Sequence, residues 1–296
     1  MTSIQASAPQ PSPASHQVTR SASAVSTPPP PPPDAPAEGS PKSWFTQSFV
    51  LAGRQLIVLL RDRATVLQIL LVPALTMVMF KVVLGDVVGK ATGQDSAYGT
   101  VPLVILVSAM FGSIASGVRL NLERGTGLLG RLYVLPINRG ADLTSRVICE
   151  IVRIAVTTAI LLAAGTLIGF RFTQGPWAVL GIVGVALLFG VAFSVFVLAL
   201  AVNARPTAPI VPLLSLVCSL LMFFNSGFSP IDAYPTWLQP IVEHQPMTPA
   251  IEVMRAFAAG GPITENLIAV IAWSVGLIVV FTYPALRGYR KAATSR

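Results

Sequence analysis

Residues 176–202, PWAVLGIVGVALLFGVAFSVFVLALAV, form a run of 27 residues without a single charge. A bilayer core about 30 Å thick is crossed by about 20 apolar residues in an α-helix. A barrel strand would instead alternate apolar and polar residues over about ten positions. The run therefore predicts a transmembrane helix, which satisfies its backbone hydrogen bonds internally.

Five more stretches meet the same criterion, at residues 64–84, 101–118, 154–170, 206–231 and 266–286. Only the first holds a charge, Lys81, which lies near its end where the side chain can reach the interface. We therefore expect an all-α, polytopic membrane protein with six transmembrane helices.

The composition of the 296-residue chain points the same way. It is 53% apolar and 11% charged, whereas soluble globular proteins carry roughly a quarter charged residues. Two cysteines, Cys149 and Cys218, and two histidines argue against a disulfide framework and against a Cys/His metal centre. We expect no metal and no cofactor on this chain.

Residues 1–43 differ from the rest, because they are rich in Pro, Ser and Ala and include a proline run at 28–33. Such a composition cannot bury a core. We expect a disordered cytoplasmic tail at 1–43, one transmembrane domain at 44–291 and a short cytoplasmic tail at 292–296.

The basic residues predict the orientation, since Lys and Arg are retained on the cytoplasmic side. With both termini inside, only Lys81, Lys90, Arg171 and Arg255 of the 20 Lys and Arg residues lie outside. This distribution accounts for the net charge of +8 without any nucleic acid partner. The expected location is the cytoplasmic membrane, with both termini cytoplasmic.

Two segments outside the spans have amphipathic patterns. Residues 44–63 separate polar from apolar side chains at helical spacing, which favours a helix in the inner interface. The alternative is that they merely extend the first span. Between spans five and six, five prolines divide residues 228–257 into pieces, and we expect two short helices at the outer leaflet.

The basic loop between spans two and three carries Leu128, Leu129, Leu132 and Leu135 at helical spacing, ahead of Pro136. A short helix with an apolar side needs a partner to cover it. That partner is either the protein's own bundle or a cytoplasmic protein, and composition leaves both open.

The chain has no G-x-x-x-x-G-K-[ST] phosphate loop, so ATP binding by that route is excluded. Five spans lack the charged residues that ion-coupled carriers use, and hydrolase motifs are absent. The residues indicate a conduit that something else powers. Two rivals stay open: a membrane enzyme acting on lipid-linked substrates, using the outer acidic residues Asp232, Glu243 and Glu252, and a non-transporting scaffold.

Two patterns together resemble a known family. The first is Glu123-Arg124-x-x-Gly127-Leu128-Leu129-x-Arg131-Leu132-x-x-x-Pro136, and the second is Phe228-x-Pro230, Pro235-x-Trp237-Leu238-Gln239-Pro240, Pro246-x-Thr248 and Met254-Arg255-Ala256. Over residues 44–291 the chain is similar to the ABC type-2 export permeases. Within them it most resembles the actinobacterial daunorubicin/doxorubicin-resistance permeases, in particular the DrrC type.

The resemblance implies roles for these residues. The loop helix would dock on a separate cytoplasmic ATP-binding cassette subunit, which uses ATP and Mg²⁺. Coupling would fall to Glu123, Arg124, Gly127, Leu128, Leu129, Arg131, Leu132 and Pro136. It further implies a second permease subunit, related or identical, and export of a hydrophobic or amphipathic drug or a cell-envelope lipid from the membrane.

A path through the membrane would be lined by residues of the apolar spans. Candidates are Phe111, Phe223, Phe224 and Asn225, for which helix packing or lipid contact is the alternative role.

Overall fold

The computed structural model describes residues 40–92, 95–125, 141–204 and 210–294, all in one compact unit, Pro36–Arg296. Regular structure within these ranges is helical throughout, which confirms the all-α prediction for the described residues. Five helices are long and apolar enough to cross a membrane, so the chain is a multi-pass membrane protein. They are α2 (Arg63–Thr92), α3 (Ala97–Gly125), α5 (Ala141–Leu167), α6 (Trp177–Asn203) and α10 (Thr264–Thr294).

The fifth predicted span, 206–231, is wrong in its bounds. The helix there, α7 (Ile210–Phe223), has 14 residues and ends before Asn225. The Asn225 amide oxygen accepts the N–H groups of Gly227 and Phe228 at 2.9 and 3.0 Å. A side chain that binds the backbone two and three residues ahead favours a turn over a helix, which is why the chain leaves the helix here despite its apolar sequence.

The third predicted span, 154–170, starts too late. Helix α5 begins at Ala141, so residues assigned to the cytoplasmic loop are part of a span-length helix. The reason is that its charges are paired: Arg146 with Asp142, and Arg153 with Glu150. Paired charges lose much of the penalty that an isolated charge has in an apolar environment, so a charge-free window misses the helix start.

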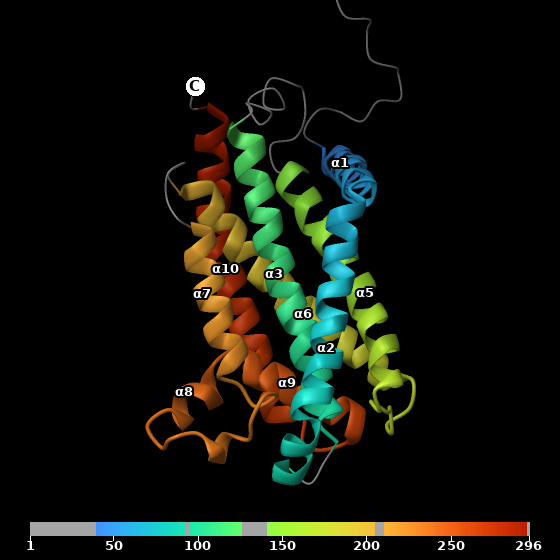
Figure 1. Ribbon diagram of the computed structural model, residues 1–296. Helices are drawn as coiled ribbons and strands as arrows, with labels where there is room; N and C mark the ends of the chain where they lie inside the picture. The colour runs from blue at the N-terminus through green and yellow to red at the C-terminus, as the bar shows by residue number, and fades with distance from the viewer. Residues whose placement is uncertain (1–39, 93–94, 126–140, 205–209, 295–296) are drawn as a thin grey trace, which may run out of the picture. The chain divides into compact units, whose positions relative to one another are not determined.

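Helix α6 lies at the centre of the bundle and packs against α3, α5, α9 and α10 (Figure 1). In the apolar stretch of each span, 72% of the residues of α3 and 67% of those of α6 are buried inside the protein, compared with 6% for α2 and 11% for α10. The core therefore lies between α3 and α6, while α2 and α10 expose most of their apolar surface.

Small residues let these helices approach closely. A Cβ on Gly190 of α6 would lie 2.6 Å from Cδ1 of Ile154 in α5, and one on Gly181 would lie 2.8 Å from the ring of Phe257. Helices in membranes pack by such close contacts, because lipid offers no hydrophobic drive for their association.

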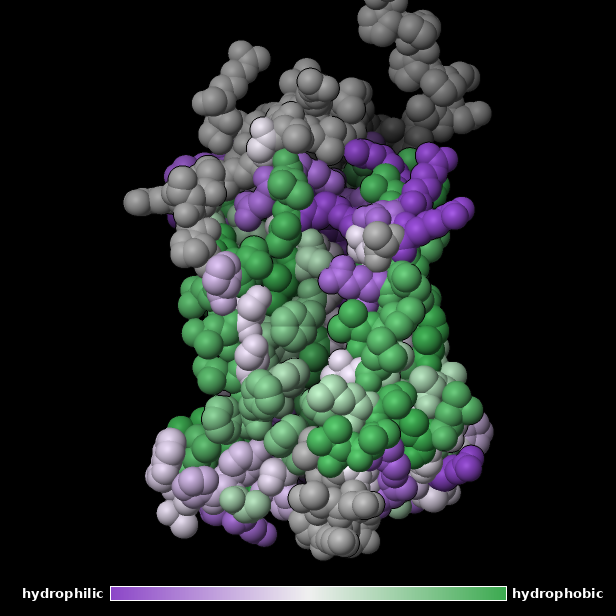
Figure 2. Space-filling view, in the orientation of Figure 1, coloured by the Kyte–Doolittle hydropathy of each residue, from purple (hydrophilic) through white to green (hydrophobic). Residues whose placement is uncertain are grey.

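The helix ends divide between two ends of the bundle (Figure 1). Both described chain ends, at residues 40 and 294, lie at the same end as the last turn of α3 and the first turns of α5 and α7. The opposite end holds α8 (Gln239–His244) and the start of α10. Apolar side chains dominate the surface between them, and hydrophilic ones gather toward the two ends (Figure 2). This distribution is the one a membrane belt requires.

Helix α1 (Pro41–Arg61) is capped at its start by Ser40, whose side chain accepts the N–H of Ser43. A break at Asp62 separates it from α2. It therefore does not simply continue the first span, as Figure 1 also shows, where α1 turns away from the axis of α2. Its place at the inner membrane interface stays a prediction.

The segment after α7 contains a 3-10 turn, η1 (Ile231–Ala233), then α8 and α9 (Met247–Ala259). Most of α9 is buried, and its end is held where the backbone N–H and hydroxyl of Thr173 both donate to the carbonyl of Ala258, at 2.9 and 2.8 Å. Short helices are thus present in this segment, while their predicted position in the outer leaflet stays a prediction.

Candidate functional site

The predicted coupling segment lies between α3 and α5. Gly127, Leu128, Leu129, Arg131, Leu132 and Pro136 fall in residues 126–140, outside the described residues. Glu123 and Arg124 belong to the last turn of α3, which ends at Gly125, and α5 starts at Ala141. The segment therefore connects two helices whose facing ends are described.

These two helix ends are joined by charge. The Arg146 guanidinium of α5 lies 2.5 Å from the Glu123 carboxylate of α3, and its Nε donates to Asp142 at 2.9 Å. The hydroxyl of Tyr289, near the end of α10, donates to the same Asp142 oxygen at 2.8 Å. We call Glu123, Asp142, Arg146 and Tyr289 the end network; it ties α3, α5 and α10 together beside the connection.

Helix α1 joins the same place. Its Gln55 amide donates to the Ser145 hydroxyl of α5 at 3.0 Å, and Ser145 is fully buried. Ser48 and Ala52 on the same helix are buried as well. A displacement of the 126–140 connection would therefore act on four helices that are already bonded to one another.

The family resemblance names Glu123 as a coupling residue, which stays a prediction, and gives no role to the other three members of the end network. The charge distribution predicts only that Arg146 lies on the cytoplasmic side. A usable signal was present, since Asp142, Arg146, Glu150 and Arg153 alternate in sign at spacings of four, four and three residues. That spacing places opposite charges on one helix face and predicts a helix starting near residue 141.

The candidate path residues are of two kinds. Phe111, Phe223 and Phe224 are exposed on the surface of this chain, at 39%, 50% and 38%. Asn225 is completely buried, and its amide nitrogen donates to the carbonyls of Leu221 and Met222. Its atoms thus serve the turn after α7, while a path along the three phenylalanines stays a prediction.

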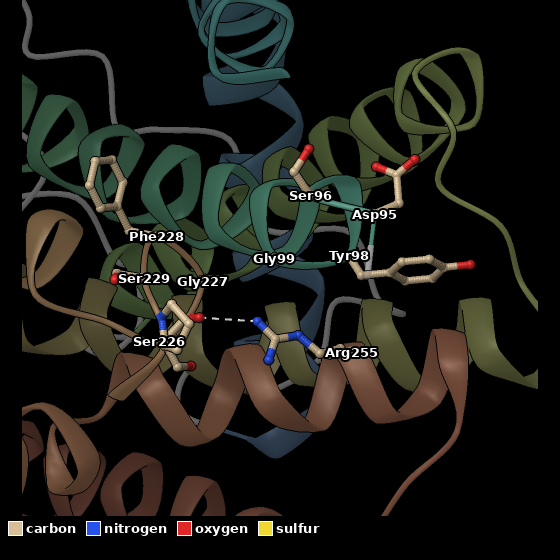
Figure 3. A pocket seen from close by; sticks show the side chains of 10 residues that line it. Asp95, Ser96, Tyr98, Gly99, Ser226, Gly227, Phe228, Ser229 and Arg255 are labelled. Carbon is tan, nitrogen blue, oxygen red and sulfur yellow. Dashed lines mark hydrogen bonds between the residues drawn. The ribbon is translucent and has the colours of Figure 1, made fainter. Parts of the chain in front are cut away.

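A small polar pocket lies at the opposite end of the bundle, between the start of α3, the turn after α7 and α9 (Figure 3). Gly99 and Gly227 meet here, since a Cβ on Gly99 would lie 2.6 Å from the Gly227 carbonyl oxygen. Arg255 of α9 donates to the carbonyl of Ser226 at 3.1 Å, drawn as the dashed line in Figure 3. The two backbones approach this closely because both Gly99 and Gly227 lack a side chain.

The rim of this pocket is charged. Asp95 is paired with Lys81 and accepts the N–H of Ala97 at 2.9 Å. Burial by itself raises the pKa of Asp95, but the Ala97 N–H and the Lys81 ammonium outweigh it and leave the pKa below its ordinary value of 3.8. Asp95 is therefore ionised at neutral pH, and the pocket offers polar contacts rather than a proton donor.

The three acidic residues that the rival membrane-enzyme hypothesis would use lie in separate elements. Asp232 lies in η1, Glu243 in α8 and Glu252 in α9, where Glu252 is paired with Arg255 at 3.0 Å. Among the described residues, groups of three or more His, Cys, Asp or Glu that could hold a metal do not occur.

Comparison with known proteins identifies the family. The sequence pattern of the family described as "ABC-2 type transporter" matches residues 46–258. The chain is 36% identical over 258 residues to the probable doxorubicin resistance ABC transporter permease protein DrrC of Mycobacterium tuberculosis, covering 87% of this chain and 93% of that protein.

Two further relatives carry related names. The daunorubicin resistance ABC transporter permease protein DrrB1 of Streptomyces coeruleorubidus is 27% identical over 224 residues, which is 76% of this chain and 79% of that protein. The doxorubicin resistance ABC transporter permease protein DrrB of Mycobacterium tuberculosis is 27% identical over 189 residues, 63% of this chain and 64% of that protein.

The sequence resemblance to this family is thereby confirmed. The helical bundle, its apolar belt and the match over most of its length lead to one conclusion: the chain belongs to the ABC-2 type transporter family.

Proposed function

We propose that the chain is the permease subunit of an ATP-driven exporter that moves a hydrophobic or amphipathic compound outward from the cytoplasmic membrane. The observation that carries this proposal is the end network, which bonds α3, α5 and α10 at the two helix ends flanking residues 126–140. A force applied to that connection would reach the spans directly.

The proposed partner at the connection is a separate ATP-binding cassette subunit, which binds and hydrolyses ATP with Mg²⁺. The chain's own sequence lacks a phosphate-binding loop, so the energy must come from elsewhere. Coupling then falls to Glu123, Arg124, Gly127, Leu128, Leu129, Arg131, Leu132 and Pro136. A second permease subunit, related or identical, completes the path.

The end of the bundle with both described chain ends is assigned to the cytoplasm. Its basic side chains include Lys42, Arg54, Arg61, Arg63, Arg287 and Lys291. The end that holds α8 has few basic residues, Lys81 and Arg255 among them. Positive residues are retained inside, which supports cytoplasmic termini.

We further infer that α7 is the sixth crossing. Helix α6 ends at the proposed cytoplasmic end and α10 begins at the other end, so the chain crosses between them. Fourteen helical residues extend about 21 Å, which is less than the bilayer core of about 30 Å. The crossing at α7 is therefore short, and the turn at Asn225 completes it inside the protein.

The proposed cargo is an amphipathic drug of the anthracycline kind or a cell-envelope lipid. The exposed surface of the spans is apolar, and the ionic groups Arg146 and Arg153 within them are paired. Such a surface suits a compound that enters sideways from the membrane and offers no fixed charge for an ionic solute. The names of the relatives that mention daunorubicin and doxorubicin resistance support the drug class.

Purification of the tagged protein in mild detergent tests this proposal. We expect a subunit with a phosphate-binding loop and a second permease to co-purify, with vanadate-sensitive ATP hydrolysis that doxorubicin or envelope lipid stimulates. Stimulation by one class and not the other identifies the cargo. Recovery of this chain alone, without hydrolysis, would contradict the exporter and favour a membrane enzyme or a scaffold.

A further inference from the structure

A second charged cluster lies deeper along α5 than the end network. The guanidinium of Arg153 lies 2.5 Å from the Glu150 carboxylate, and its Nε donates to the same oxygen at 3.0 Å. The side chains are 5% and 3% exposed. Two ionic groups are thus almost completely buried inside a membrane-span helix, where such groups are rare and often mark functional sites.

Both groups reach across to α3. Arg153 Nη2 donates to the carbonyl of Ala109 at 3.2 Å, and Nη1 contacts the carbonyl of Ser108 at 3.5 Å. Two turns further along α3, the hydroxyl of Ser116 donates to Glu150. The pair on α5 therefore holds α3 at two levels, on one face of that helix.

A glycine makes room for the guanidinium. A Cβ on Gly112 of α3 would lie 1.9 Å from Arg153 Nη1 and 2.2 Å from Cζ. No rotation of a methyl group relieves an overlap of that size, so the arginine lies across α3 only because residue 112 lacks a side chain.

The contacts on α3 continue to the end network, where Glu123 bonds Arg146. Ala109, Ser116 and Glu123 are seven residues apart, and seven residues are about two helical turns. We call this line of contacts the α3–α5 seam. It consists of Ser108, Ala109, Gly112, Ser116 and Glu123 on α3 and of Arg146, Glu150 and Arg153 on α5.

We propose that Arg153 and Glu150 are positioning residues that lock α3 to α5, so that the two helices move as one unit when the connection between them is displaced. Sliding or separation would remove charge-assisted hydrogen bonds in an apolar environment that offers no replacement partners. The lock itself follows from the contacts, while its role in transport rests on the proposed function.

Two exposed residues of α3 show what a locked pair would move. Phe111, next to Gly112, is exposed, and so is Leu122 three turns further along the helix. The helix that the seam holds therefore also carries a candidate path residue outside the seam. A movement of the α3–α5 unit would shift Phe111 while the seam contacts stay in place.

The sharpest test is Gly112→Ala, with Gly184→Ala as its matched control. The first change moves the Arg153 guanidinium but leaves every charge in place, whereas a Cβ on Gly184 of α6 has no neighbour within 4 Å. Both variants place alanine, which favours helix, in a membrane span, so both proteins are expected to insert into the membrane.

Spin labels at Leu122 of α3 and Val152 of α5, both exposed, measure the lock in the purified chain. The buried Cys149 and Cys218 are replaced by alanine in every sample. We expect one narrow distance distribution for the parent and for Gly184→Ala, and a broadened or shifted one for Gly112→Ala. An unchanged distribution in Gly112→Ala would overturn the lock.

Transport in the full complex measures the role of the lock. Gly112→Ala should raise the ATP hydrolysed per molecule exported severalfold, and Arg153→Lys, which keeps the charge, should lie between it and the parent. A broadened distribution with an unchanged ratio would overturn the role in coupling. Absence of export in the parent complex would instead contradict the proposed function, while the spin-label result still decides the lock.

Discussion

Arg146 of α5 and Glu123 of α3 form an ion pair at 2.5 Å although the 15 residues of 126–140 connect their helices. The pair lies next to the connection and is largely buried, with side-chain exposures of 8% and 22%. Because Asp142 and Tyr289 continue it into α10, three helix ends are bonded to one another next to residues 126–140.

Leu132→Asp should uncouple ATP hydrolysis from export. A charge on the apolar side of the expected loop helix would weaken its contact with the ATP-binding subunit, because the carboxylate would have to leave water there. We expect normal insertion, retained hydrolysis and loss of export, measured as drug transport per ATP in the reconstituted complex.

The matched control for that change is Leu122→Asp. Leu122 is 66% exposed on α3, close to the connection but inside the described helix. If Leu132→Asp exported as well as the parent, the assignment of the coupling helix would be wrong.

Tyr289→Phe should lower stability by about 0.5–1.5 kcal/mol, the usual contribution of one hydrogen bond. The change removes the bond to Asp142 and leaves the ring in place. Thermal unfolding in detergent measures it, with Tyr283→Phe as control, since Tyr283 on the same helix is 68% exposed. Equal melting temperatures for the two variants would contradict a structural tie between α10 and α5.

Gly99→Ala should destabilise the polar pocket between the start of α3, the turn after α7 and α9. Its Cβ would lie 2.6 Å from the backbone oxygen of Gly227, and a backbone atom cannot rotate away. We expect a loss of about 1–3 kcal/mol, typical of overpacking, detected as a lower midpoint of thermal unfolding. Gly53→Ala, with no neighbour within 4 Å, should be neutral or stabilising, and a similar loss in both would argue against the close glycine contact.

The ion pair of Asp95 and Lys81 predicts a pH dependence. The pKa of Asp95 is below 3.8 in the folded protein, so its stabilising effect is complete at neutral pH. This stabilising effect fades as the pH falls from 3.8, the ordinary pKa of the carboxyl, through the lower pKa that Asp95 has in the folded protein. Asp95→Asn should therefore melt below the parent at pH 7, with a difference that shrinks in acid; a difference that grew in acid would have the wrong sign.

Much of the fold could be predicted from the sequence because a bilayer imposes one simple rule. Uninterrupted apolar runs such as 176–202 correspond to α6, and the break before α2 follows from the polar residues near Asp62. The family could also be predicted, because both patterns, at residues 123–136 and 228–256, lie within the residues 46–258 that match it.

The errors arose where polar groups satisfy one another inside the bundle. A search for charge-free windows cannot place the start of α5, since Asp142, Arg146, Glu150 and Arg153 enter the helix as pairs. Such a search also cannot predict that α7 ends at Phe223, because that end depends on hydrogen bonds that the Asn225 side chain accepts. The seam was hidden for the same reason: its partners lie 23 to 45 residues apart in the chain.

The most direct test of the exporter is ATP-driven uptake of doxorubicin into inside-out membrane vesicles that contain this chain, the ATP-binding subunit and the second permease. Accumulation that requires ATP hydrolysis and disappears with Leu132→Asp, but not with Leu122→Asp, is the predicted result. Vesicles that hydrolyse ATP with all three subunits present, yet accumulate neither doxorubicin nor envelope lipid, would contradict it.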